Sequence, residues 1–342
     1  MRRFSMAMPL EMWVGLYLLL YLPNVMVTRL VTTTPHPGLG RPLTGLETLP
    51  ASLIISLVLT YLFIWLSGWH KDANKVSMGG IRFPFPTKFT FFSSLGTALI
   101  LFTVPLSFTI PDVSIPFMQL LMRGDILIIA PLLDLFFGRR VRWWSWVALV
   151  MVLVALALTL FERGGFNLPP IAIVTIVLYT LGYFLRLAVM NYISKDGDPA
   201  TVRRYFVEEK IMALPLSVAA LALLSLSGIG GQSSELYWGF VSVWTDPVIV
   251  DIFVIGFTLT LISVVSIIIL LDPHENAYCV PLERAASLIA GVGGSVLLAW
   301  FWGGRMPPSS ELVGAVILIL AIAVLSLAPR LSPSGRVSVD RV

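Results

Sequence analysis

The stretch VIVDIFVIGFTLTLISVVSIIILL, residues 248–271, decides the class of fold. Its only charged residue is Asp251, near its start, and an apolar run of this length matches a transmembrane helix, which needs about 20 residues. A window of about 20 residues moved outward from it finds further apolar runs at 10–31, 47–67, 89–110, 114–137, 143–161, 168–193, 206–229, 277–302 and 310–328. We therefore expect an all-α polytopic membrane protein with ten transmembrane helices.

The composition agrees with a chain that lies mostly in lipid. Hydrophobic residues make up 57% and charged residues only 12%, whereas soluble domains carry about 25% charged residues. The net charge of +4 is small and the basic residues gather in short loops, so we expect no nucleic-acid partner. The single cysteine, Cys279, excludes an internal disulfide.

Sequence motifs for catalysis and for cofactors are scarce. The run Asp272-Pro273-His274-Glu275-Asn276 lacks the second histidine of a zinc-protease helix, and the chain has neither a phosphate loop nor a cysteine pair for zinc. We expect no cofactor and no metal, and a protein that is not an enzyme. An intramembrane enzyme is the less favoured alternative.

Loop charges predict the orientation in the membrane, because cytoplasmic loops carry an excess of Lys and Arg. Ten spans with a cytoplasmic N-terminus place nearly all basic loop residues on the cytoplasmic side, and both termini with them. The side expected to be cytoplasmic contains Arg2, Arg3, Lys71, Lys75, Arg82, Lys88, Arg139, Arg140, Arg142, Lys195, Arg203, Arg204, Lys210, Arg330, Arg336 and Arg341. A bacterial inner membrane is the default location, with an organelle membrane as the alternative.

The ten spans divide into two halves, residues 1–163 and 164–330, followed by a Ser/Pro/Arg-rich segment, 331–342, that we expect to be a disordered cytoplasmic tail. Because each half has five spans, the two halves would have opposite orientations. Arg123 in the fourth span and Arg284 in the ninth fall at matching places and at similar depth. Two inverted five-helix repeats would bring both arginines to the middle of the bilayer, where such transporters bind their solutes.

Two stretches resemble the drug/metabolite transporter superfamily in its EamA-like, ten-span inverted-repeat form. Residues 118–132, MQLLMRGDILIIAPL, are similar to the fourth span of that family, and residues 278–292, YCVPLERAASLIAGV, to the ninth. The glutamate that many members carry after the glycine ending these spans is absent, since Arg139 and Gly304 follow Gly138 and Gly303. Basic residues in the two spans resemble instead the sugar-phosphate and nucleotide-sugar branches, which implies an anionic substrate.

An arginine near the centre of a membrane helix costs about 2.5–3.5 kcal/mol on insertion scales. Arg123 and Arg284 each offer a planar, permanently charged fork suited to carboxylate or phosphate, or else a structural ion pair. Asp125 and Glu283 are the candidate ion-pair or coupling residues, although neither shares a helix face with its neighbouring arginine.

The remaining candidates for substrate contact are Arg186, Asn24, Gln119 and Tyr278. Arg186 has two interpretations, a side chain that extends toward the basic loop or a ligand contact. Asn24 would supply neutral hydrogen bonds, and Gln119 and Tyr278 lie in the two stretches that resemble the family. For Glu208 and Glu209, near the cytoplasmic mouth, we expect a solvated or loop-paired role.

The sequence thus predicts a secondary transporter that moves a small organic, anionic metabolite across the membrane by alternating access. The alternative is a proton-coupled exporter of neutral or cationic solutes. The expected partners are a small-molecule substrate and the lipid bilayer, and a homodimer is compatible with this reading.

Overall fold

The fold is that of a computed structural model of the chain. It describes residues 8–78, 81–107, 110, 113–115, 117–122, 143–162, 168–193, 198–228, 230–272, 276–304 and 306–331. Arg123 and Asp125 lie outside these residues, as do Arg2, Arg3 and the tail beyond Leu331. Of Tyr278 only the backbone is described.

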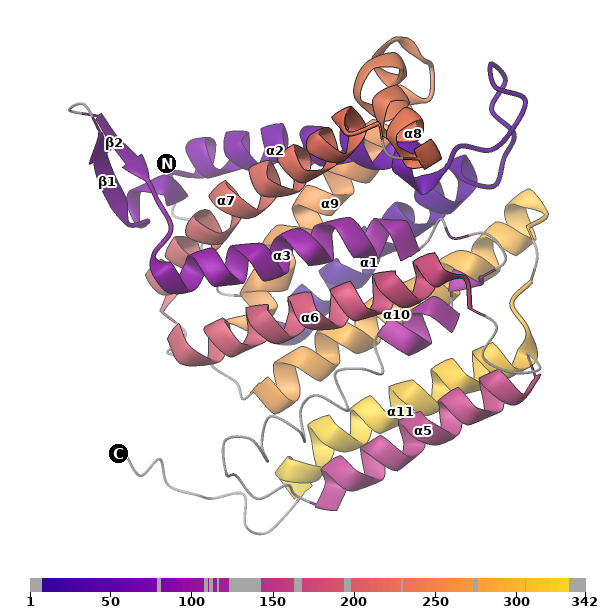
Figure 1. Cartoon of the computed structure of the whole chain (residues 1–342). Coiled ribbons are helices and arrows are strands. Elements are labelled where there is room, and N and C mark those ends of the chain that lie inside the picture. The colour runs from indigo at the N-terminus through magenta and orange to yellow at the C-terminus, as the bar shows by residue number, and fades with distance from the viewer. Residues whose placement is uncertain are drawn as a thin grey trace.

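Long helices dominate the described chain and run roughly parallel to one another (Figure 1). They are α1 (Leu10–Val31), α2 (Gly45–Ser67), α3 (Lys88–Ser107), α5 (Trp143–Glu162), α6 (Pro170–Ile193), α7 (Pro199–Leu226), α9 (Ile249–Leu270), α10 (Asn276–Trp302) and α11 (Ser309–Leu331). Among the described residues, seven helices are long and apolar enough to cross a membrane, and the apolar stretches of α5 and α11 are shorter. This predominantly helical architecture is compatible with a polytopic integral membrane protein.

The helices begin and end within a few residues of the predicted spans, with one instructive exception. The seventh span was expected to begin near residue 206, but α7 begins at Pro199. Asp198 caps this end by accepting hydrogen bonds from the backbone N–H groups of Ala200 and Thr201, and these bonds lower the pKa of the Asp198 carboxyl. Proline at the first helical position favours the same start. Of the predicted fourth span, residues 117–122 are helical and 123–137 lie outside the described residues.

Short polar elements lie at the two ends of the bundle (Figure 1). At one end, β1 (Lys75–Met78) and β2 (Ile81–Pro84) form an antiparallel hairpin after the short helix η1 (Trp69–Lys71). At the other end, α8 (Gly230–Val241) and η2 (Ser242–Thr245) follow Gly228, whose positive φ of 66° ends the preceding chain segment. We refer to these as the hairpin side and the α8 side. The sequence predicted only loops in both places.

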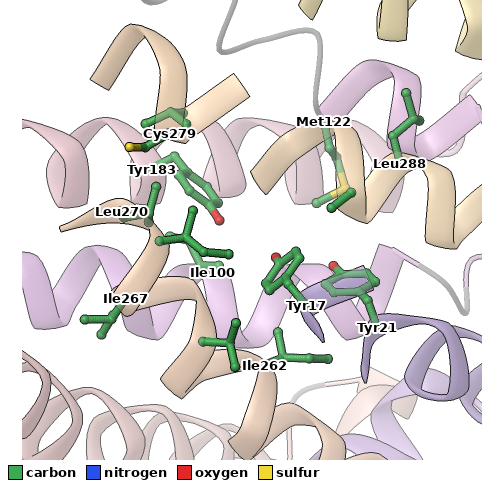
Figure 2. Packing of buried hydrophobic residues seen from close by; sticks show 14 of the residues in the cluster. Tyr17, Tyr21, Ile100, Met122, Tyr183, Ile262, Ile267, Leu270, Cys279 and Leu288 are labelled. Atoms are coloured by element: carbon green, nitrogen blue, oxygen red, sulfur yellow. The ribbon is translucent and has the colours of Figure 1, made fainter. Parts of the chain in front are cut away.

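One large apolar cluster fills the space between the helices. Tyr17 and Tyr21 project into it from α1, near Met122 and Leu288, and Tyr183 projects into it from α6 beside Ile100 (Figure 2). The outer surface is also apolar, since large side chains such as those of Leu223 and Phe301 are exposed. A surface of this kind is typical of helices that face lipid.

Two helices approach each other very closely where α3 crosses α6. A methyl group added to Gly96 would lie 2.5 Å from the carbonyl oxygen of Gly182, and one added to Gly182 would lie 2.7 Å from that of Gly96. Only glycine fits at either position, because a real side chain would force the two backbones apart. Helix α6 also carries Arg186, one turn beyond Gly182, which is described below.

We predict that Gly96→Ala lowers the melting temperature of the purified protein in detergent. Gly15→Ala is the matched control, because a methyl group at Gly15 meets nothing within 4 Å. Alanine is intrinsically better than glycine in a helix by about 1 kcal/mol, so the control should be neutral or stabilising. Equal melting shifts for the two variants would contradict the close packing of α3 on α6.

Candidate functional site

Arg284 of α10 is fully buried and is held by two tyrosines of α6. Its Nη1 atom donates a hydrogen bond to the hydroxyl of Tyr179. The guanidinium carbon lies 3.4 Å from the ring centroid of Tyr183 and 5.5 Å from that of Tyr179. Tyr179 and Tyr183 are one helical turn apart and therefore share a face of α6. A permanently charged group is thus placed against two aromatic rings, an arrangement that stabilises cations.

The neighbouring Glu283 makes its contacts with a different helix. Ser266 of α9 donates a hydrogen bond of 2.5 Å to Oε1 of the buried Glu283 carboxyl. Its other oxygen, Oε2, is buried and accepts no hydrogen bond from the described residues. Glu283 also interacts electrostatically with Arg186 of α6. Adjacent residues of a helix point about 100° apart, which is why Glu283 and Arg284 reach different neighbours.

A second buried charge cluster joins α6 to α7. The Nε atom of Arg186 donates to Oε1 of Glu209 over 2.9 Å, and both side chains are buried. The ammonium of Lys210 lies 3.7 Å from Oε2 of Glu209. Two cations therefore share one carboxylate. The Nη2 atom of Arg186 is buried and donates no hydrogen bond to the described residues.

Hydroxyl groups complete the surroundings of Glu209 and join α3 to the same cluster. Thr97 of α3 donates to Oε1 over 2.5 Å, and the hydroxyl oxygens of Ser93 and Tyr205 lie 3.3 Å and 3.1 Å from it, so that either can donate to it. Ser93 also bonds directly to Tyr205. A carboxylate inside an apolar bundle needs this number of donors, because lipid offers none.

Glu208, one residue earlier, faces the hairpin side. It is fully buried and accepts hydrogen bonds from the backbone N–H groups of Asn74 and Thr87, at 3.0 Å and 3.4 Å. Arg204, one turn earlier in α7, donates to it over 2.8 Å. Glu208 therefore has the loop-paired role expected from the sequence, while Glu209 lies inside the bundle instead.

The other candidate residues lie at different helix contacts. The amide of Asn24 in α1 donates to the Ile255 carbonyl, at 3.0 Å, and to the Thr258 hydroxyl, at 2.9 Å, both in α9. Gln119 is buried beside Gly291 of α10. The structure thus brings Arg186, Glu283 and Arg284 together around α6 and α10, whereas Asn24 lies at the α1–α9 contact. Substrate contact by any of them remains a prediction.

Sequence reasoning missed Glu209, Lys210, Tyr179 and Tyr183 as parts of the site. The signal for the tyrosines was their spacing of four residues in an apolar helix that also contains Arg186. The signal for Glu209 and Lys210 was weaker, because a charged group at the start of a span more often faces water. Within the described ranges, no group of three or more His, Cys, Asp or Glu side chains is close enough to hold a metal ion.

Comparisons with known proteins show a likeness in fold but no family. No protein-family model matches the sequence, and no curated protein is similar to it. One crystal structure, described only as that of a protein, superposes with a TM-score of 0.54 at 13% identity, covering 92% of this chain and 98% of the other. The arrangement of helices therefore recurs over nearly the full length of another chain. At this level of identity the likeness concerns the fold alone.

We predict that Glu209→Gln destabilises the folded protein by about 3–5 kcal/mol, because it leaves Arg186 and Lys210 buried without their carboxylate. Asp72→Asn is the matched control, since Asp72 pairs with Arg203 over 2.5 Å at a partly exposed position. Breaking such a surface pair costs at most about 1 kcal/mol. Denaturation of both purified variants measures the difference, and similar losses would show that the Glu209 cluster contributes no more than a surface pair.

Proposed function

We propose that this protein is a secondary transporter that moves a small organic anion across a membrane by alternating access between two halves. The observation that carries the proposal is the charge of the described interior. Arg186, Lys210 and Arg284 are buried cations, and the buried carboxylates of α7 and α10 are those of Glu208, Glu209 and Glu283. Three buried cations, two of them arginines, therefore lie within this described part of the apolar bundle.

The buried arginines favour an anionic solute over a neutral one. Arginine keeps its charge even when it is buried, so it cannot lower the free-energy cost of its burial by losing a proton. A carboxylate or phosphate group that entered the bundle would accept paired hydrogen bonds from a guanidinium. The Nη2 atom of Arg186 is available for such a bond, since no described residue accepts one from it.

We further propose that the helices form two inverted repeats of five spans. The pattern of helix contacts supports this arrangement. It stays the same when α1 is exchanged with α6, α2 with α7, and α3 with α9. Helix α3 packs against α6 and α7, and correspondingly α9 packs against α1 and α2. Helices α5 and α11, the last of each proposed half, pack against each other (Figure 1).

A matching pair of tyrosines gives independent support for the repeat. Tyr17 and Tyr21 lie one turn apart near the middle of α1, with ring centroids 5.4 Å apart. Tyr179 and Tyr183 repeat this spacing in α6, with centroids 4.8 Å apart. All four are buried. Arg284 contacts the rings of the second pair. Arg123, its counterpart in the sequence, lies outside the described residues.

In the proposed mechanism, the anionic group of the solute binds to Arg284 and Arg186 between the halves. Rocking of one half against the other then exposes this site to either side in turn. The contact of Arg284 with Tyr179 and Tyr183 would hold α10 against α6 while the site is empty. Membership of the drug/metabolite transporter superfamily belongs to the same proposal and rests on the resemblance of residues 118–132 and 278–292.

Glu283 favours a second candidate function, the proton-coupled export of a neutral or cationic solute. Its Oε2 atom is buried and accepts no hydrogen bond from the described residues, so the carboxyl could carry a proton there. In that case the solute would bind near Ser266 and Glu283, and the arginines would be structural.

A panel of organic carboxylates and phosphate monoesters, tested for thermal stabilisation of the purified protein, separates the two candidates. We expect at least one anion to stabilise the protein and to show saturable uptake into proteoliposomes. Arg284→Gln and Arg186→Gln should each weaken its binding by about ten- to hundredfold, since each lost charge-assisted contact is worth about 1.5–3 kcal/mol.

Arg41→Gln is the matched control, because Arg41 pairs with Glu47 on the α8 side, far from the two arginines in the fold. Anion binding that survives both central substitutions would contradict the anionic site. Uptake of cations or neutral solutes that follows an imposed pH gradient and is lost in Glu283→Gln would support the second candidate.

We also propose that the hairpin side faces the cytoplasm, because Lys71, Lys75, Arg82, Lys88 and Arg203 lie there and only Arg29 and Arg41 are described at the other end. In a Cys279→Ser background, Ser77→Cys should react with a membrane-impermeant maleimide only after cells are permeabilised. Thr33→Cys, on the α8 side, should react in intact cells. The reverse pattern would invert the topology.

A further inference from the structure

A cavity of about 570 Å³ opens on the hairpin side, between the ends of α3, α6 and α7. Its wall includes Lys88 and Phe89 at the start of α3, Tyr192 near the end of α6, and Arg204 and Glu208 in α7. Tyr205 lies at its buried end, next to the Glu209 cluster. This cavity plays no part in the proposed transport step.

The charged groups of the cavity favour an anion. Glu208 accepts hydrogen bonds from the backbone N–H groups of Asn74 and Thr87 and forms an ion pair with Arg204, so its negative charge is already compensated. Arg204 uses Nε for that bond, and half of its side chain remains exposed. The exposed ammonium of Lys88 forms no ion pair with any described residue. The two cations of the cavity wall, Lys88 and Arg204, therefore outnumber its one carboxylate, Glu208.

The other wall of the cavity is aromatic and continues onto the lipid-facing surface. The rings of Phe89 and Tyr192 lie 4.5 Å apart, and both side chains are exposed, by 47% and 70%. Phe92, one turn further along α3, is 55% exposed. Exposed rings beside cations at the end of an apolar span are typical of the layer where lipid headgroups lie.

We propose that this cavity binds the phosphate headgroup of an anionic phospholipid. Lys88 and Arg204 contact the phosphate, and Phe89, Tyr192 and Phe92 pack against the glycerol and the first part of the acyl chains. Charge complementarity selects phosphate, and the continuous apolar surface selects a lipid over a soluble phosphate ester. Tyr205 then links the bound lipid to the Glu209 cluster, where α3, α6 and α7 meet, because its hydroxyl bonds to Ser93 and Glu209.

Native mass spectrometry of the detergent-purified protein tests this site with two named lipids. We expect phosphatidylglycerol to bind at least tenfold more tightly than phosphatidylcholine of the same acyl chains. Lys88→Gln should weaken phosphatidylglycerol binding three- to tenfold, and Lys88→Gln with Tyr192→Ala should remove the preference. Lys88 and Tyr192 are exposed surface residues, so both variants should fold.

Lys75→Gln with Arg82→Gln is the matched control, since it removes two charges from the same side of the molecule at the hairpin. Lipid preference that falls as far in this control as in Lys88→Gln would reduce the site to general surface charge and overturn the proposal. Glycerol 1-phosphate that displaces phosphatidylglycerol at equal concentration would identify a soluble phosphate ester as the ligand and would also overturn it. These outcomes do not depend on whether the protein transports anions.

Discussion

The ion pair between Arg186 and Glu209 is the interaction on which the rest of the structure depends. It lies inside an apolar bundle, where each charge alone would be costly, and it joins α6 to α7. Thr97 and Ser93 add α3 to the same joint through hydroxyl bonds to the carboxylate. The glycine contact between α3 and α6 permits this closeness, because any larger side chain would separate the donors from Glu209. Packing and charge compensation are therefore achieved by the same three helices.

Further buried cations lie close to this ion pair, and they connect the structure to the proposed function. Lys210 shares the carboxylate that Arg186 already uses, and Arg284 lies nearby against the rings of Tyr179 and Tyr183. A bundle built for stability alone would gain by replacing such groups with apolar side chains. The presence of these buried charged groups is consistent with the proposed site, which would bind an anion during part of the transport cycle. In the proposed inverted-repeat arrangement, the tyrosine pairs of α1 and α6 would lie symmetrically about this site.

Most of the helical architecture could be predicted from the sequence, because the length and hydropathy of a span are local properties. The limits of α1, α9 and α10 follow directly from their apolar runs. The β-hairpin and α8 were missed, since their short polar sequences carry no membrane-length signal. The burial of Arg284 was foreseen, but its contacts with Tyr179 and Tyr183 depend on how α10 packs on α6. Glu209 was assigned to the mouth of the bundle for the same reason: only the fold shows that its partner is Arg186.

The proposed function requires the buried cations of the interior to bind an anion. Anomalous diffraction from crystals of the intact protein grown with bromide would locate such an anion directly. We expect a bromide peak within contact distance of the Arg186 or Arg284 guanidinium, among α6, α9 and α10. Bromide found only beside exposed cations such as Arg41 and Lys88, with the interior empty at saturating concentration, would contradict it.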